Sequence, residues 1–154
     1  HPVDRRQRQM CIRDRNQTGW TDHDQPDEVS RETISQLTAY FHGDLRCFDL
    51  PLLPAGASKP RRRWLNVMAK IPFGTTISYT TFAAAAGHPN AARAAGFACA
   101  TNPIPIIYPC HRVLRKDGQL GNYSGGSHLP PTHQDNLRRK AFLISHETRQ
   151  LDSH

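Results

Sequence analysis

Cys110 and His111 are adjacent in the chain, and a cysteine beside a histidine can supply a nucleophile and a base. A cysteine attacks as its thiolate, and an imidazole can take the proton that the thiol must lose. Adjacent side chains do not face each other on a helix or a strand, so a contact needs a bend in the backbone or a bridging water. A lone cysteine is more often a small buried apolar residue. The pair by itself leaves both a nucleophilic site and an ordinary buried thiol open.

The residues just before Cys110 indicate how it is positioned. The apolar run 104–107 predicts a buried strand, and the prolines at its ends restrict the backbone there. Such a strand would deliver Cys110 to an irregular segment of the chain.

Two short helices are predicted at 80–86 and 90–100, joined through Gly87, His88 and Pro89, which is typical of a helix-turn-helix. Seven of the eleven residues of the second predicted helix are Ala or Gly, and Arg93 is its one charged residue. An ordinary helix is about 10–12 Å across, whereas the DNA minor groove is only about 6 Å wide. A helix trimmed to small residues can approach that groove closely. Tight packing between neighbouring helices explains the same composition, and the two explanations can hold on different faces.

The rest of the chain predicts three parts. Apolar residues recur at helical spacing over Pro26–His42 and again over Arg61–Lys70, with an extended linker at Leu50–Gly56 between them. The first twenty residues are rich in Arg and Gln without an apolar pattern. We therefore expect a disordered, non-native segment at 1–20, a linking helix and linker at 21–56, and a folded domain at 57–154.

Positive charge is concentrated in the predicted folded domain at 57–154. Residues 1–56 contain seven basic and nine acidic residues, and residues 57–154 contain thirteen basic and four acidic residues, a net +9. This is the charge pattern expected of a nucleic-acid binder, although a solvated basic face would show it equally.

Other classes of site are not predicted. There is no Cys-x-x-Cys pair, which argues against a zinc ribbon or a disulfide scaffold, and His128 and His133 lack a third ligand, so we expect no metal and no cofactor. No apolar run approaches the roughly 20 residues of a membrane span, and there is no signal-peptide core. The expected location is the cytoplasm, or the nucleus in a eukaryote, without membrane contact.

The motif Pro-Cys-His-Arg-Val at 109–113 resembles the active-site signature of the O6-alkylguanine-DNA alkyltransferases. Further motifs of that family occur in the family's order, at Ile71-Pro72-Phe73-Gly74, Ser78-Tyr79, Arg93-Ala94-Ala95-Gly96, Asn102-Pro103, Gly121–Gly126 and His146-Glu147. The resemblance covers about Pro26 to Leu151. It implies a mainly helical α+β fold, with a winged helix-turn-helix-like catalytic and DNA-binding domain at 57–154 and a short strand or hairpin near the active site. It also implies that the family's amino-terminal α/β domain is absent or truncated, with 21–56 as its remnant.

The resemblance assigns the chemistry to four residues. Cys110 would attack the alkyl carbon on O6 of guanine and keep the alkyl group in a single irreversible turnover. His111 would take the thiol proton through a water, and Glu147 would orient the imidazole. Asn102 would hold the surroundings of the cysteine, although an Asn-Pro turn explains that residue equally well. From the residues alone, a solvated position on the last helix is the more common interpretation of Glu147.

The resemblance also implies that the target nucleotide is flipped out of the duplex. Arg93 would take its place in the stack, Tyr79 would crowd its 3′ phosphate, and Ala92 and Ala94 would lie in the minor groove. Residues expected to line the base pocket are Val113, Tyr123, Ser124 and Gly125. The implied partner is double-stranded DNA containing O6-alkylguanine, with O4-alkylthymine a further candidate. The protein is expected to be a monomer without an obligate protein partner.

Three alternatives remain at this point. A non-catalytic damage-binding relative would carry another residue, often Trp, at position 110. A thiol hydrolase would have no use for an Ala-rich helix with Arg93, and a helix-turn-helix regulator would need Gln, Asn or several Arg on that helix. The chain also departs from the family pattern, with Ser58-Lys59-Pro60 in place of Phe-Gln, a shifted aromatic at Trp64, and an extra stretch at Ser127–Asn136.

Overall fold

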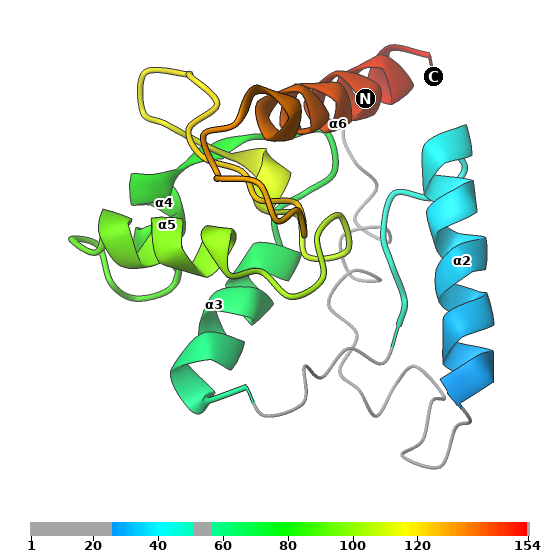
Figure 1. The fold of residues 1–154 in the computed structure, drawn as a ribbon, viewed down its shortest axis with the longest axis horizontal. Helices are drawn as coiled ribbons and strands as arrows, with labels where there is room; N and C mark the ends of the chain where they lie inside the picture. Colours follow the sequence, from blue (N-terminus) through cyan, green and yellow to red (C-terminus); the bar gives the residue numbers. More distant parts are fainter. Residues whose placement is uncertain (1–25, 51–56, 154) are drawn as a thin grey trace. The chain divides into compact units, whose positions relative to one another are not determined.

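The computed structural model of the chain describes residues 26–50 and 57–153 (Figure 1). In chain order, the elements are α2 (Pro26–His42), α3 (Lys59–Ala69), β1 (Ile77–Ser78), α4 (Tyr79–Ala85), α5 (Ala92–Ala100), the 3-10 turn η2 (Cys110–Arg112), β2 (Val113–Leu114) and α6 (Gln134–Asp152). They fall into two units divided between Ala55 and Gly56, which we describe separately. The predominance of helices among these elements confirms the predicted mainly helical class.

The first unit is the helix α2 with the segment that follows it. The helix has the predicted bounds Pro26–His42, and it stops at Gly43, whose φ of 86° suits glycine. The side chain of Gln36 accepts from the Asp49 N–H (2.8 Å) and donates to the Asp49 carbonyl (2.9 Å). Cys47 is disulfide-bonded, a bond that the cysteine spacing did not predict. The predicted segment at 1–20 and the linker after Leu50 lie outside the described residues.

In the second unit, α4 and α5 lie side by side, as Figure 1 shows, and α3 packs against both. The first of the two predicted helices, 80–86, is observed at Tyr79–Ala85, where the Ser78 hydroxyl caps it by accepting from the Thr81 N–H (3.0 Å). The second begins two residues later than predicted, because Pro89 and Asn90 form a turn before it. The three helices enclose a core that includes Leu65, Met68, Phe82, Ala83, Ala95 and Cys99.

The sheet consists of two short parallel strands. Ile77 pairs with Val113, and Ser78 pairs with Leu114. Strand β1 leads directly into α4, and strand β2 directly follows η2. The predicted strand near the active site is present, but it is not part of a hairpin, because parallel strands need a crossover and α4 and α5 supply it.

The strand predicted at 104–107 is wrong. This stretch forms turns, with an isolated bridge between Pro105 and Tyr108 and a hydrogen bond from the Tyr108 N–H to the Ile104 carbonyl (3.0 Å). Ile106 has a φ of 74°, a left-handed conformation that is rare for a β-branched residue. Prolines lack the N–H groups that a ladder requires, so this apolar run closes on itself instead of pairing with a strand.

The long helix α6 crosses over the η2 turn and completes the unit (Figure 1). The side chain of Asn136 donates to the Leu129 and Pro130 carbonyls, and the His133 imidazole caps the helix by accepting from the Asp135 N–H (3.2 Å). The extra stretch before the helix is therefore bound to its first turn. Among the described helices, none has the length and apolar character of a membrane span.

Gly74 packs against Leu151 of α6, and Gly74→Ala is expected to destabilise the protein. Its φ is 73°, and a Cβ there would stand 2.2 Å from Leu151 Cδ1. The left-handed backbone alone costs an alanine about 1–2 kcal/mol, and Leu151 must also move. The matched control is Gly118→Ala, because Gly118 has a φ of 82° but nothing within 4 Å of a Cβ. Urea unfolding should show a larger loss for Gly74→Ala, and equal losses would contradict the packing argument.

Candidate active site and nucleic-acid interface

Cys110 opens the η2 turn, between the loop at 103–109 and strand β2. The turn is closed by hydrogen bonds from the Cys110 N–H to the Tyr108 carbonyl (2.8 Å) and from the Arg112 N–H to the Pro109 carbonyl (3.0 Å). It supplies a bend in the backbone at the Cys-His pair, which an extended strand or a regular helix would not. Cys110 and His111 are both buried, with exposed fractions of 2% and 0%.

Asn102 holds the loop that leads to the cysteine. Its side-chain amide donates to the Tyr108 carbonyl (2.7 Å), and its side-chain oxygen accepts from the Ile104 N–H (3.0 Å). The bond to Ile104 is a turn at the Asn-Pro pair, and the bond to Tyr108 ties Asn102 to the segment just before Cys110.

Helix α6 brings Glu147 against His111. The Glu147 Oε1 and His111 Nε2 atoms are 2.7 Å apart, and both side chains are buried. Burial alone would raise the pKa of Glu147, but hydrogen bonds from His111 and Arg112 outweigh it and hold that pKa well below its ordinary value. An ionised carboxylate favours the tautomer with the proton on Nε2. His111 Nδ1 is then an acceptor, and it is buried without a hydrogen-bond partner among the described residues.

Burial raises the pKa of the Cys110 thiol, and this effect outweighs the Asn102 hydrogen bond and the nearby charge of Lys140, which both lower it. At rest the group is therefore a thiol, and its proton must leave as it reacts. Of the described cysteines, Cys99 on α5 is also a free buried thiol, and burial raises its pKa.

Lys140 is a residue of this site that the sequence did not reveal. It is fully buried on α6, and its ammonium donates to the Leu120 and Asn122 carbonyls and lies 5.7 Å from the centre of the Tyr79 ring. Burial lowers its pKa to about 8. One signal was present in the sequence, since Lys140 and Glu147 recur at helical spacing on one face of the last helix.

The four residues expected in a base pocket lie on two segments. Val113 is buried in β2, and Tyr123 is buried near Cys110, where burial raises the tyrosine pKa. Ser124 donates to the Ala100 carbonyl (2.9 Å). A Cβ on Gly125 would stand 2.6 Å from the Tyr123 ring, so glycine lets this loop fold over the tyrosine.

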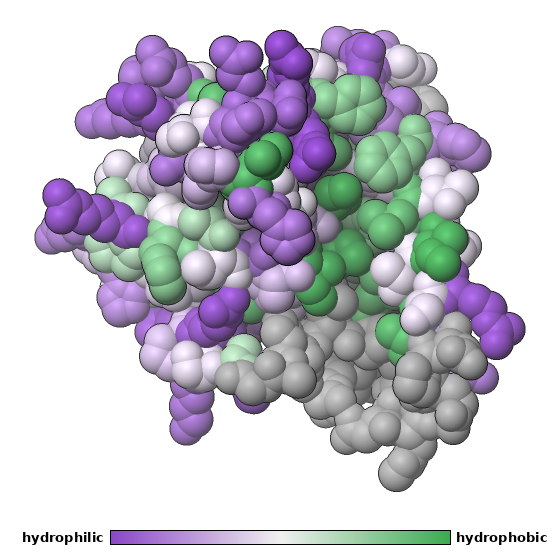
Figure 2. All heavy atoms as spheres, in the orientation of Figure 1, coloured by the Kyte–Doolittle hydropathy of each residue, from purple (hydrophilic) through white to green (hydrophobic). Residues whose placement is uncertain are grey.

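The small residues of α5 serve two different faces. Ala95 and Cys99 are buried against the other helices, whereas Ala92, Arg93 and Ala94 are exposed. A Cβ on Gly96 would meet nothing within 4 Å, so packing within the chain does not require glycine there. Figure 2 shows a weakly coloured to pale green surface over α4 and α5, with long hydrophilic side chains projecting from its edge. The small exposed face is thus available to an external partner.

Tyr79 stands at the start of α4, because the Ser78 cap begins the helix there. Its hydroxyl donates to the Asn122 carbonyl (3.4 Å), and burial raises its pKa to about 12. It therefore connects the helix-turn-helix to the loop that carries Tyr123.

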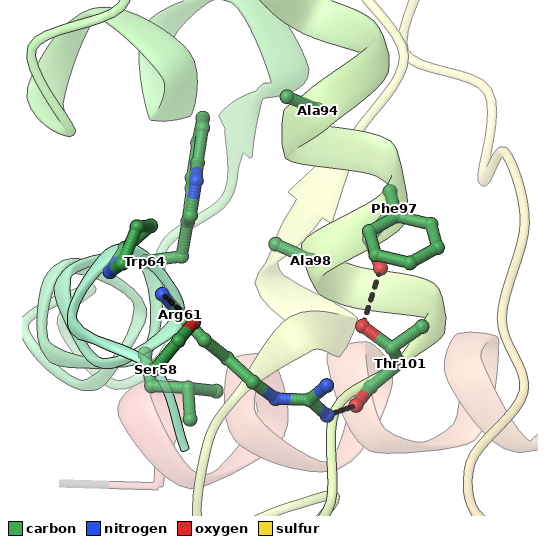
Figure 3. A pocket seen from close by; sticks show the side chains of 9 residues that line it. Ser58, Arg61, Trp64, Ala94, Phe97, Ala98 and Thr101 are labelled. Carbon is green, nitrogen blue, oxygen red and sulfur yellow. Dashed lines mark hydrogen bonds between the residues drawn. The ribbon is translucent and has the colours of Figure 1, made fainter.

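A groove of about 280 Å³ lies between α3 and α5 (Figure 3). Its walls include Trp64 on α3 and the exposed Phe97 on α5, and the Arg61 guanidinium donates to the Thr101 carbonyl at one end. Ala94 is the one predicted site residue in its lining, and Cys110 is not part of it. The groove is therefore a feature of the α5 surface and not the place of the chemistry.

Comparison with known proteins identifies the family of this chain. Residues 59–149 match the family described as "6-O-methylguanine DNA methyltransferase, DNA binding domain". The chain is 44% identical over 100 residues to a methylated-DNA–protein-cysteine methyltransferase of Methanosarcina acetivorans, covering 65% of this chain and 64% of the relative. It is 43% identical over 121 residues to the protein of that name from Methanosarcina barkeri, covering 79% of this chain and 70% of the relative.

A crystal structure of Mycobacterium tuberculosis OGT in complex with DNA is similar in fold, with a TM-score of 0.68 and 38% sequence identity. That match covers 78% of this chain and 68% of the other. The family match spans most of the second unit, and the sequence and fold matches agree with it. The chain therefore belongs to the 6-O-methylguanine DNA methyltransferase family, the methylated-DNA–protein-cysteine methyltransferases.

Proposed function

We propose that this chain repairs DNA by transferring an alkyl group from O6 of guanine to the sulfur of Cys110, once per molecule. The observation that carries the proposal is the buried array of Cys110, His111 and Glu147, in which the imidazole is held on one side by the carboxylate (2.7 Å) and has an unpartnered acceptor on the other. This is the arrangement of nucleophile, base and orienting group that recurs where a weak nucleophile must be activated.

In the proposed step, the Cys110 sulfur forms a bond to the alkyl carbon as the bond from that carbon to O6 breaks. The thiol proton passes through a water to His111 Nδ1, and Glu147 stabilises the imidazolium that results. The electron pair of the broken bond remains on the guanine, which leaves as the unmodified base after taking up a proton. Because burial keeps the resting thiol protonated, attack and proton loss belong to the same step.

The proposed substrate is double-stranded DNA, and the exposed small face of α5 is its docking surface. A duplex base cannot reach a buried sulfur, so the nucleotide must be extruded. Arg93 is the charged side chain on this face and would fill the gap in the stack, while Tyr79 would press on the adjacent phosphate. The net +9 of residues 57–154 favours binding to phosphates. We infer a monomer that acts where the DNA is, in the cytoplasm or the nucleus.

The alternative of a thiol hydrolase differs in what happens after attack. A thioester is hydrolysed because water attacks its carbonyl, but an S-alkylcysteine offers only a saturated carbon with a poor leaving group. A hydrolase therefore turns over, and the proposed transferase does not.

This difference is the test of the proposal. With methylated duplex DNA in excess, methyl transfer is expected to stop at one methyl per chain. The tryptic peptide 94–112 contains both Cys99 and Cys110, so fragment-ion mass spectrometry must place the methyl group on Cys110. Cys99→Ser is the matched control and should give the same plateau. Turnover beyond one methyl would revive the hydrolase, and a methyl on Cys99 would move the acceptor.

A further inference from the structure

The Glu147 carboxylate is shared between two side chains. It holds His111 through Oε1, and it also receives the Arg112 guanidinium, with Nη2 donating to Oε1 (2.8 Å) and Nε to Oε2 (3.0 Å). The Gly74 N–H donates to Oε2 as well (3.0 Å). In a simple pair of carboxylate and histidine, the imidazole would have the negative charge to itself, and here it does not.

Arg112 is fixed as firmly as the carboxylate. It is 5% exposed, its Nη1 donates to the Ile71 carbonyl (2.5 Å), and its guanidinium lies 5.7 Å from the centre of the Phe73 ring. Each of its three nitrogens is therefore engaged, and the planar group cannot turn away from Glu147 without breaking its contacts to the segment 71–73.

We propose that Arg112 is a positioning residue of the transfer reaction, which acts through Glu147 to keep His111 neutral and its Nδ1 atom ready to accept the thiol proton. The inference rests on the proposed function, in which His111 is the base. It adds a role for the fourth residue of the Pro-Cys-His-Arg-Val motif that the relay of thiol, imidazole and carboxylate does not contain.

The charges around His111 support this role. The η2 turn contributes Arg112 and the Cys110 thiol, and α6 contributes Glu147 and Lys140. Arg112 offsets part of the Glu147 charge, so an imidazolium would be less well compensated in a buried place that already holds the Lys140 ammonium.

The effect on the histidine has a clear sign. Burial lowers the pKa of His111, the hydrogen bond and charge of Glu147 raise it, and the charges of Arg112 and Lys140 lower it further, leaving it below its ordinary value. A lowered pKa means that the ring is neutral at pH 7. Without Arg112, an unshared carboxylate would favour the imidazolium, whose Nδ1 carries a proton and cannot accept another.

The test uses the whole chain and two variants. Arg112→Met removes the charge but keeps an apolar stem, and Arg112→Lys keeps a positive charge. The His111 ring is titrated by nitrogen-15 NMR in the unreacted protein, and the rate of single-turnover transfer is measured from pH 5 to 8, a window of about the range in which histidines titrate.

We expect the wild-type His111 pKa to lie below about 6.5. Arg112→Met should raise it by about one pH unit or more, the size of shift that one nearby charge produces, and should move the acidic limb of the rate profile by the same amount. Arg112→Lys should stay closer to the wild type. A purely structural anchor would lower the rate equally at every pH and leave the histidine titration unchanged, which would overturn the proposal.

The proposal remains testable if Arg112→Met does not fold, because a wild-type His111 that titrates at or above its ordinary value contradicts it directly. The NMR titration does not require transfer. A chain without transferase activity would therefore refute the proposed function separately from the role of Arg112.

Discussion

Cys110→Ser is expected to abolish alkyl transfer and to leave the affinity for DNA within about twofold of the wild type. The substitution changes one atom at a position that is 2% exposed, so the docking surface on α5 is untouched. A hydroxyl holds its proton more tightly than a thiol does, and its oxygen is a poorer nucleophile than sulfur toward a saturated carbon. Labelled-methyl transfer measures the first expectation, and a gel-shift titration on undamaged duplex measures the second.

The matched control for this experiment is Cys99→Ser. It removes the other buried free thiol near the site, so it reproduces any packing effect of the exchange. Transfer should survive in that variant. If Cys110→Ser still accepted methyl groups, the nucleophile would have to be placed elsewhere in the chain.

Arg93→Ala is expected to slow repair of duplex DNA by about a hundredfold, with little effect on the reaction with free O6-benzylguanine. Extruding a nucleotide costs a few kcal/mol in a duplex, and every 1.4 kcal/mol or so corresponds to a factor of ten in rate. A free base needs no extrusion. Arg93 is exposed at the start of α5, so its removal opens no cavity in the core.

The two substrates are compared by single-turnover kinetics under the same conditions. Arg138→Ala on α6 is the charge-matched control, because its side chain is 76% exposed and pairs with Asp135 at the surface. That variant should repair duplex DNA at nearly the wild-type rate. Equal slowing of Arg93→Ala on both substrates would remove Arg93 from the flipping role.

The largest error of the sequence analysis lies beside the nucleophile. The run 104–107 has the composition of a buried strand, and the structure folds it into turns around Ile106. An apolar composition favours burial, and Ile107 is buried while 104–106 are half-buried, but prolines that cannot donate and the Asn102 side chain decide which hydrogen bonds the run makes. For this part of the chain, the family motif at 109–113 indicated the active site, whereas the apolar pattern at 104–107 indicated a strand that does not form.

The elements that depend on interactions between neighbouring residues were determined by the sequence itself. The bounds of α2, the helix-turn-helix and the small exposed face of α5 follow from apolar spacing, capping residues and side-chain size, which act within a turn or two of helix.

The charges of the site were decided only by the tertiary structure. Glu147 lies 36 residues from His111 in sequence, and from the residues alone it resembles a solvated position. The burial of Arg112 depends on the Ile71 carbonyl and on Glu147 of α6, and that of Lys140 depends on the Leu120 and Asn122 carbonyls, all of them distant in sequence. Removing a charge from water is favourable only when its partners are already in place, and no local pattern in a sequence records where those partners will stand.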